Sequence, residues 1–301
     1  MGWRNIVITQ HAKVMYSMNR LIIQTDQDKY TVPVGDIQLL MLETTQAVIT
    51  TGAVCALAEE HAKVIFTDHQ GNPVSETTDY YPTRRTADLI RRQVAWPERR
   101  IANLWTKNIG SKIQNQIQVV DFNKLESQSL VDELDKLELN DITNREAVVA
   151  NKYFTILFGS EFYRRDFNPV NAALNYGYAI LLSLVNRAVV ANGYLTCIGI
   201  HHVNNENEFN LGSDLMEPFR PIIDQWVSQQ HFDEFTQNIK IGLVSLLSVQ
   251  LVFNGREQIL SNAIKEHVAN CLHFLSGETD EIQIEVIIPN EVSSHAINGH
   301  V

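Results

Sequence analysis

Residues 63–96 read KVIFTDHQGNPVSETTDYYPTRRTADLIRRQVAW and contain the change of pattern that decides the fold. The stretch begins with KVIFT, which is rich in the β-branched and aromatic residues that favour strands, and continues into the polar turn HQGN. After DYYPTRR, residues 79–85, apolar residues recur at intervals of three and four, as in amphipathic helices. A boundary between two domains of different type is therefore expected near residue 80.

The chain before residue 80 consists of short runs that are typical of β-strands. Their Val, Ile, Thr and Tyr residues are separated by polar turns such as TDQD. One segment differs, because TTGAVCALAEEHA at 50–62 has its apolar residues at helical spacing. Residues 1–78 are therefore predicted to form a small β-rich domain with one helix. The strand-like runs are NIVIT, KVMYS, RLIIQT, KYTVPV, AVIT and KVIFT.

The chain after the boundary is predicted to be helical. Residues 79–92 are expected to be a linker, residues 93–288 a larger all-α domain, and residues 289–301 a polar tail. The fold class expected from this order is α+β. Helical spacing of apolar residues extends through 83–140, 144–158, 170–190, 215–235 and 239–274.

The composition is that of a globular protein: 301 residues, of which 45% are hydrophobic and 20% charged. The longest apolar runs, at 179–185 and 241–253, are shorter than the roughly 20 residues that a bilayer requires. They favour buried helices, and no membrane partner is expected. The N-terminus MGWRNIVITQ lacks the basic start and apolar core of a signal peptide, so we expect a cytoplasmic location.

The net charge of −11 argues against a nucleic-acid partner, but its distribution is uneven. Phosphate contacts depend on local charge, because screening acts over about 10 Å. A solvated helix face is the more common explanation of a basic helix, and a track for a phosphate backbone is the alternative. Between residues 84 and 112, two acidic residues, Asp88 and Glu98, stand against the basic residues Arg84, Arg85, Arg91, Arg92, Arg99, Arg100, Lys107 and Lys112.

Most catalytic motifs are absent from the sequence. It contains no G-x-x-x-x-G-K-[ST], no G-x-G-x-x-G and no G-x-S-x-G, which disfavours nucleotide hydrolysis, dinucleotide redox chemistry and α/β-hydrolase chemistry. Acidic residues and histidines remain as the candidates for chemistry.

Three pieces of sequence carry these candidates, and each also has a purely structural explanation. Thr143 and Glu146 fit a capping box, although a carboxylate at that helix start could also face a site. His201 and His202 follow an apolar run, where a hydrogen-bonded boundary residue is more common than a ligand.

The third piece is SDLMEPFRPIID at 213–224. Asp214 is predicted as a helix N-cap. That local role explains Glu217 only in part, since Glu217 would lie beside the apolar stripe of Phe219 and Ile222. Carboxylates at an apolar wall, with a histidine on the preceding loop, are suited to a hard divalent cation.

Several distinctive motifs follow one another in the sequence: REAVVANKY at 145–153, GSEFYRR at 159–165, NPVNAALNYGYAIL at 168–181, GIHH at 199–202 and SDLMEPFRP at 213–221. With these motifs in order, nearly the whole chain resembles the CRISPR-associated spacer-acquisition integrases, the "Cas one" family. The β-rich opening VITQHAKVMYSMNRLII is similar to the version found in type II systems. The resemblance implies a dimerising N-terminal β domain and a C-terminal α domain that holds the active site.

The resemblance assigns the catalytic, metal-binding side chains to Glu146, His202 and Glu217, with Asp214 as the assisting acid. Glu217 is an aspartate in some relatives, and the histidine of the G-x-x-H pattern falls on His202. The chain departs from many relatives at 147–149, where they have a glycine followed by small residues, so a somewhat different helix packing is expected.

The implied reaction is attack by the 3′-hydroxyl of a short DNA fragment, a prespacer, on a phosphodiester of the CRISPR repeat, with Mg²⁺ or Mn²⁺ as cofactor. The histidine favours Mn²⁺. The implied partners are double-stranded DNA, a second copy of the chain, and the small "Cas two" protein bridging two dimers. A role for the type II effector nuclease stays open. DNA-binding candidates in this context are Arg84, Arg85, Arg91, Arg92, Arg99, Arg164 and Arg165.

Two other functions remain open at this point. The same ligands would suit a metal-dependent nuclease of another pathway that acts on branched or single-stranded DNA. The acidic residues could instead be helix caps in a non-enzymatic, DNA-binding scaffold.

Overall fold

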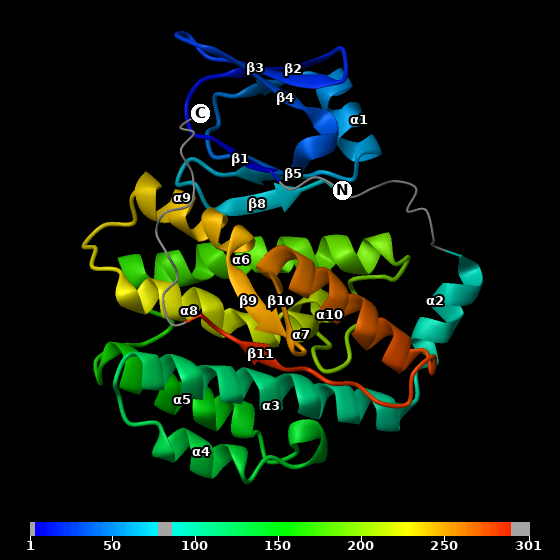
Figure 1. The fold of residues 1–301 in the computed structure, drawn as a ribbon, viewed down its shortest axis with the longest axis vertical. Helices are drawn as coiled ribbons and strands as arrows, with labels where there is room; N and C mark the ends of the chain where they lie inside the picture. The colour runs from blue at the N-terminus through cyan, green and yellow to red at the C-terminus, as the bar shows by residue number, and fades with distance from the viewer. Residues whose placement is uncertain (1–3, 78–85, 290–301) are drawn as a thin grey trace. The chain divides into compact units, whose positions relative to one another are not determined.

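The computed structural model describes residues 4–77 and 86–289 (Figure 1). These residues separate into two compact units at the gap between them. The first unit is mainly β and the second mostly α, which confirms the predicted α+β class. Arg84, Arg85 and the predicted tail from residue 290 onward lie outside the described residues.

The first unit contains two four-stranded sheets and one helix. One sheet has the order β1(Arg4–Ile8), β5(Ile37–Leu42), β7(Lys63–Thr67), β8(Pro73–Glu76). The other has the order β4(Lys29–Pro33), β3(Arg20–Gln24), β2(Lys13–Ser17), β6(Val48–Ile49). The helix is α1(Thr51–Glu59), and a 3-10 turn, η1(Val34–Asp36), precedes β5.

Strand β5 is the centre of its sheet. It pairs in parallel with β1 on one side and with β7 on the other, and all six of its residues are buried. Apolar side chains from both sheets, such as Leu40 and Leu21, pack in one core with Leu57 of α1. Helix α1 begins where the Thr50 side chain accepts a hydrogen bond from the Ala53 backbone N–H, which agrees with the helix predicted at 50–62.

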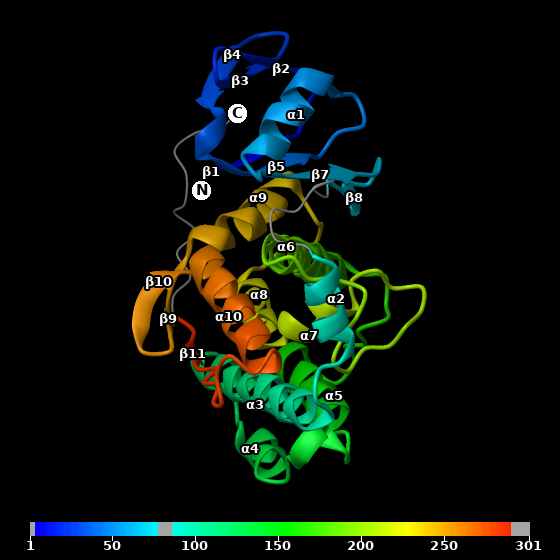
Figure 2. The same ribbon diagram turned by 90° about the vertical axis from the view of Figure 1, so that its right-hand side faces the viewer.

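The second unit is built around two long helices, α3(Glu98–Phe122) and α6(Pro169–Ala191). Helix α8(Arg220–Gln229) packs against both of them, as Figure 2 shows. The other helices are α2(Ala87–Val94), α4(Gln128–Leu134), α5(Arg145–Phe158), α7(Asn210–Leu215), α9(Gln237–Ser245) and α10(Leu260–Leu275). Short 3-10 turns are η2(Leu139–Asp141), η3(Glu217–Phe219) and η4(Leu246–Ser248).

Two predictions for this unit need correction. The expected linker at 79–92 is helical from Ala87, because the Thr86 side chain caps α2 by accepting from the Leu89 N–H. The helical segment expected over 239–274 is interrupted, so the unit is not all-α. Its short sheet has the order β10(Arg256–Ile259), β9(Gln250–Phe253), β11(Val286–Ile287).

Helix α6 is the core helix of the second unit. Asn168 caps it by accepting a hydrogen bond from the Asn171 N–H, and Pro169 occupies its first turn, where no amide hydrogen is needed. By length and composition α6 could cross a membrane, but 78% of its most apolar window is buried within the protein. The apolar character of the helix is therefore accounted for by packing in the core.

Gly177 allows α6 and α8 to approach closely. A Cβ at this position would lie 2.5 Å from Cγ2 of Ile223, a fully buried residue of α8. We expect Gly177→Ala to lower the free energy of unfolding by about 1–3 kcal/mol, because the helices must move apart. Urea unfolding measures this change. Gly52→Ala, where a Cβ would meet nothing within 4 Å, is the matched control and should be nearly neutral.

Candidate active site

A pocket of about 250 Å³ in the second unit contains the three catalytic candidates Glu146, His202 and Glu217. Arg164, predicted to bind DNA, also lines it. The side chains come from α3, α5, α6, α8, η3, the loop after α5 and the loop before α7. The other lining residues are Trp105, Lys112, Ala150, Phe154, Tyr178, His201, Arg220 and Asp224.

Helix α3 fixes the position of the segment that carries Glu217. Asn108 donates a hydrogen bond to the carbonyl of Asp214 (3.2 Å), and Asn115 donates one to the carbonyl of Pro218 (2.7 Å). Both asparagines are buried, at three- and four-residue spacing from Lys112 on the same helix face. Lys112 is thereby held beside Glu217.

Glu146 stands in the first turn of α5, but the predicted capping box is wrong. Asn144, in the left-handed conformation (φ 54°), occupies the N-cap position without a side-chain bond. The carboxylate of Asp141 caps the helix instead, accepting from the backbone N–H groups of Arg145 (2.6 Å) and Glu146 (3.0 Å). The carboxylate of Glu146 is therefore free to turn to Lys112, whose ammonium lies 2.5 Å away.

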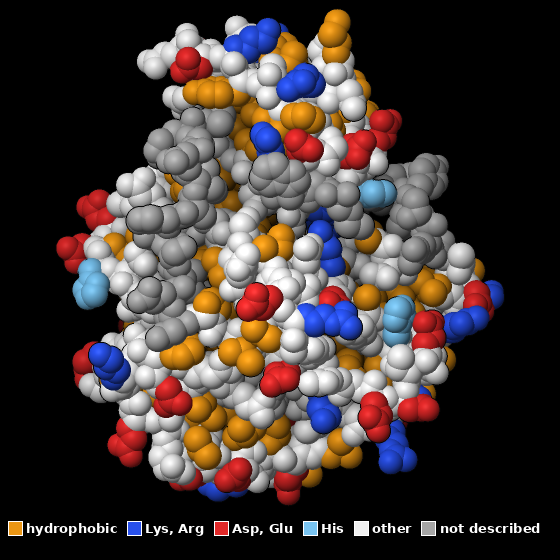
Figure 3. All heavy atoms as spheres, in the orientation of Figure 1, with side chains coloured by type: hydrophobic (Ala, Val, Ile, Leu, Met, Phe, Trp, Pro, Cys, Tyr) orange, Lys and Arg blue, Asp and Glu red, His pale blue; other side chains and the backbone are white. Residues whose placement is uncertain are grey.

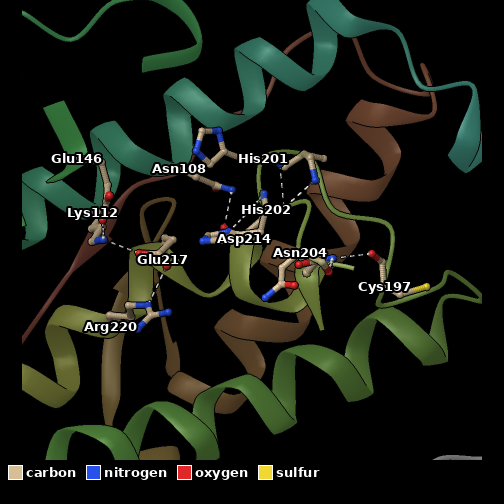
Figure 4. A network of polar contacts seen from close by, with 12 residues as sticks. Asn108, Lys112, Glu146, Cys197, His201, His202, Asn204, Asp214, Glu217 and Arg220 are labelled. Carbon is tan, nitrogen blue, oxygen red and sulfur yellow. Dashed lines mark hydrogen bonds and ion pairs between the residues drawn. The ribbon is translucent and has the colours of Figure 1, made fainter. Parts of the chain in front are cut away.

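Glu217 is a buried carboxylate between two cations (Figure 4). One oxygen lies 2.6 Å from the Lys112 ammonium, and the other lies 2.9 Å from Nε of Arg220. Burial alone would raise the pKa of Glu217, but Arg220 and Lys112 lower it below its usual value. Burial would likewise lower the pKa of Lys112, but Glu217 and Glu146 raise it. Glu217, Lys112 and Arg220 are thus charged near neutral pH.

Asp214 organises the loop that carries His202. The sequence predicts Asp214 as a helix N-cap, and this prediction is wrong. The residue lies inside α7 and is fully buried. Its carboxylate accepts from the backbone N–H groups of Ile200 (2.6 Å), His201 (3.1 Å) and His202 (3.1 Å). It also bonds Nδ1 of His202 at 2.6 Å, which raises the pKa of His202. The ring is therefore oriented, with Nε2 left available.

The adjacent His201 has a different role from His202. Its ring stacks on the buried indole of Trp105, with centroids 3.9 Å apart and planes within 5°. The Trp105 ring meets His202 edge-on at 6.0 Å. The Trp105–His201 stack therefore forms a wall of the pocket.

A second buried carboxylate, Asp224, lies at the tyrosine-lined side of the pocket. It accepts hydrogen bonds from the hydroxyls of Tyr178 and Tyr153, the latter at 3.1 Å. Burial raises the pKa of Asp224 to about 6, although both tyrosine hydrogen bonds act in the opposite direction. Asp224 therefore holds its proton in the folded state at pH values where an unfolded chain has lost it.

This shift predicts a pH dependence of stability. Between about pH 4 and pH 6 the folded state binds the Asp224 proton more tightly than the unfolded state does, so unfolding becomes easier as pH rises, by about 3 kcal/mol at most. Asp224→Asn should remove this decline in the free energy of unfolding. Urea unfolding at pH 4.5 and 7 measures it, with the exposed Asp233→Asn as control. Equal declines in wild type and Asp224→Asn would contradict the shift.

The basic residues predicted as a DNA track fall into different environments. Arg91, Arg92 and Arg99 are exposed, with Arg92 paired to Asp88 at 2.8 Å. Arg100 instead holds the chain near α10, donating to the carbonyls of Phe274 and Thr279. On the face in Figure 3, basic and acidic side chains of the second unit are interspersed. Of these basic residues, Arg91, Arg92 and Arg99 are thus exposed enough to contact DNA.

The two basic residues after α5 also differ from each other. Arg164 is bound to Asn171 and to Asn175 (2.8 Å), and its guanidinium lies over the Phe154 ring. Arg165 is exposed. Arg164 is therefore a fixed pocket residue, whereas Arg165 is a surface residue.

Within residues 4–77 and 86–289, no group of three or more His, Cys, Asp and Glu side chains is arranged to hold a metal ion. At the predicted site, the Lys112 ammonium lies between the carboxylates of Glu146 and Glu217. The three candidates share a pocket, and a lysine occupies the space between two of them.

Sequence reasoning missed several residues of the pocket. Arg220 follows Glu217 by three residues, a spacing that places charged pairs together on a helix and that could have identified it. The sequence places Lys112 only among the basic residues of 84–112, because its contact with Glu146 joins segments 34 residues apart and leaves no local signal. The sequence around Trp105 and Asp224 shows no signal beyond helical periodicity.

Residues 6–231 match the family model of the CRISPR associated protein Cas1. The chain belongs to the Cas1 family. A relative from Neisseria meningitidis serogroup C, called CRISPR-associated endonuclease Cas1, is 32% identical over 296 residues, covering 96% of each chain. A Cas1 endonuclease from Francisella tularensis subsp. novicida is 24% identical, covering 91% of this chain and 95% of its own.

Solved structures show the same fold at low identity. A casposase bound to its integration product has a TM-score of 0.76 at 17% identity, over 99% of this chain and 96% of its own. A Cas1 protein from Thermotoga maritima has a TM-score of 0.73 at 15% identity, over 91% and 97%. The Cas6-RT-Cas1–Cas2 complex contains a chain with a TM-score of 0.69 at 17% identity, over 91% of this chain and 35% of its own. The family model and the Neisseria relative confirm the family resemblance predicted from the sequence.

Proposed function

We propose that this protein is a metal-dependent DNA integrase of CRISPR adaptation. It joins the 3′-hydroxyl ends of prespacers to the CRISPR repeat by transesterification, which exchanges one phosphodiester bond for another. Membership of the family of Cas1 endonucleases supports a CRISPR integrase or nuclease. The observation that carries the finer proposal is that Glu146, His202 and Glu217, from three separate segments, line one pocket.

The donor set of this pocket fits a divalent cation. Carboxylates suit Mg²⁺ and Mn²⁺, and an added imidazole favours Mn²⁺. The carboxylates of Glu146 and Glu217 already attract a cationic group, the Lys112 ammonium. Glu146, His202 and Glu217 would hold the ion. When bound, it would supply charge stabilisation at the phosphate under attack.

The remaining charged groups of the pocket are suited to a DNA phosphate. Arg220 lies over the Tyr178 ring at 4.7 Å, and Arg164 is held by its two asparagine partners. Guanidinium groups fixed in this way lose little freedom when they bind phosphate oxygens. In this proposal they orient the phosphate, and Asp214 keeps His202 in position.

The test is strand joining by the purified protein with its small partner, a repeat-containing plasmid, a short duplex, and Mn²⁺ or Mg²⁺. We expect the labelled duplex to become covalently attached at the repeat, and the product to disappear when the duplex carries a 3′-phosphate. Cleavage of branched or single-stranded DNA without joining would favour the other nuclease function. Binding with neither reaction would favour the scaffold.

The proposed partners are double-stranded DNA, a second copy of the chain and the small Cas2 protein. The fold shared with the Cas1-containing chain of a solved Cas1–Cas2 complex supports the last of these. We propose a homodimer through the first unit and two such dimers around one Cas2 dimer. The type II effector nuclease would act upstream, in fragment selection, and the location would be the cytoplasm.

The DNA track is tested with Arg91 and Arg92 on α2. Replacing both by alanine should weaken DNA binding and reduce the slope of log affinity against log salt by about 1–2, because each phosphate contact contributes about 0.9. Fluorescence anisotropy at several salt concentrations measures the slope. The exposed residues Lys124 and Arg256, replaced together by alanine, remove the same charge elsewhere and are the control. An unchanged slope would remove α2 from the track.

A further inference from the structure

Lys112 occupies an unusual position for a lysine. The residue is only 7% exposed, and its ammonium lies 2.5 Å from Glu146 and 2.6 Å from Glu217 (Figure 4). Burying an ammonium is costly unless its charge is compensated. Two carboxylates from different segments provide that compensation. The same two carboxylates are the proposed oxygen ligands of the divalent ion.

The net charge of the pocket disfavours the presence of both the Lys112 ammonium and a divalent ion. Glu146 and Glu217 are balanced by Lys112 and Arg220, so a divalent ion added to this set would leave an excess of two positive charges at close range. If the Lys112 ammonium moves away from the carboxylates, one of those charges leaves with it. A DNA phosphate entering the pocket would then neutralise the other.

Lys112 is better suited than Arg220 to move away from Glu217 when a divalent ion binds. A lysine carries a point charge on a flexible four-carbon stem. Arg220 bonds the other oxygen of Glu217 and lies over the Tyr178 ring. The Lys112 side chain also lines the pocket of about 250 Å³ described above, so its ammonium has space beside it when it leaves the carboxylates.

We propose that Lys112 is the resident counter-cation of the Glu146–Glu217 pair, which a divalent ion must displace in order to bind. Lys112 thereby sets the ion affinity of the site and keeps the two carboxylates together before the ion arrives. This inference rests on the proposed metal-dependent function. It makes Lys112 a positioning residue for the ligands.

The experiment is a Mn²⁺ titration of the full chain, with free Mn²⁺ followed by electron paramagnetic resonance. Lys112→Met removes the charge and keeps the length of the side chain. We therefore expect this variant to bind Mn²⁺ at least about tenfold more tightly than wild type does. Lys107→Met, an exposed position on the same helix, should bind as wild type does. Glu217→Gln should bind weakly.

Thermal unfolding gives a second readout. Without Mn²⁺, Lys112→Met leaves two uncompensated carboxylates close together, so its Tm should fall. Mn²⁺ should restore that Tm, and it should raise the Tm of wild type less. Lys112→Gln, which retains hydrogen bonding, should show the same pattern with a smaller loss.

The possible failures are distinguishable. If wild type binds Mn²⁺ and Lys112→Met binds it equally or more weakly, the displacement is wrong and the metal site stands. If neither protein binds Mn²⁺ better than Glu217→Gln does, the metal site of the proposed function is also wrong. Loss of the fold in both Lys112 variants that Mn²⁺ does not reverse would likewise overturn the inference.

Discussion

Glu217→Gln and His202→Ala are each expected to abolish strand joining, with a loss of about a thousandfold or more, because each would remove one of the three proposed ligands of the ion that would stabilise charge at the phosphate. Glutamine keeps the size of Glu217 but not its charge. Alanine removes the only His202 ring nitrogen that Asp214 leaves available. DNA binding should be largely kept, because most of the proposed DNA-binding residues that the structure describes lie outside the pocket. Joining is measured on a repeat plasmid and binding by anisotropy.

Matched controls separate this expectation from a general effect of substitution. Glu257→Gln on β10 and His273→Ala on α10 change the same residue types at exposed positions. Both should join at the wild-type rate. Full activity in Glu217→Gln or His202→Ala, with each protein folded, would remove that residue from the site.

The second large effect is expected at Asp214. Asp214→Ala removes a buried carboxylate that accepts four hydrogen bonds from the loop containing His202. The donors left without partners should lower the free energy of unfolding by about 2–4 kcal/mol. Joining should fall about a hundredfold, measured below the melting temperature, because the His202 ring loses its fixed orientation.

Asp214→Asn distinguishes shape from charge at this position. The asparagine amide would direct its own hydrogens at backbone N–H groups, so it should restore little of the stability. Urea unfolding and the joining assay measure the two effects separately. Wild-type stability and joining in Asp214→Asn would show that the carboxylate is not required to hold the loop.

The two units were predictable from local patterns, but several strands were not. Strands β2, β3 and β4 alternate between core and surface or end at clear polar turns, so their sequences reveal them. β5, IQLLML, is buried along its whole length between parallel neighbours and shows no alternation. Its apolar run alone could equally have been part of a helix.

The hairpin of β9 and β10 has a turn signal in its sequence, but the apolar run before it favours a helix more strongly. The apolar run at 241–253 continues from α9 into β9, which favoured one long helix. Asn254 and Gly255, both at positive φ, form the turn between the two strands. An Asn-Gly pair after an apolar run is typical of such a turn and marks the end of the helical segment.

For the site, local rules located the right segments and gave some residues the wrong roles. Local rules predict Glu146 and Asp214 as cap residues, because capping is the usual reason for an acidic residue near a helix start. The contacts that decide their roles are long-range. Lys112 reaches Glu146 across 34 positions, and Asp214 reaches back to the His202 loop. Such contacts depend on tertiary packing and are not encoded in any local pattern.

Glu146, His202 and Glu217 are proposed to bind one divalent ion. Anomalous diffraction from crystals soaked in Mn²⁺ tests it most directly, since the manganese position is located independently of activity. We expect a manganese peak within coordination distance of both carboxylates and of Nε2 of His202, with Lys112 moved from between the carboxylates. A manganese-free pocket in fully soaked crystals, with Lys112 still paired to both glutamates, would contradict it.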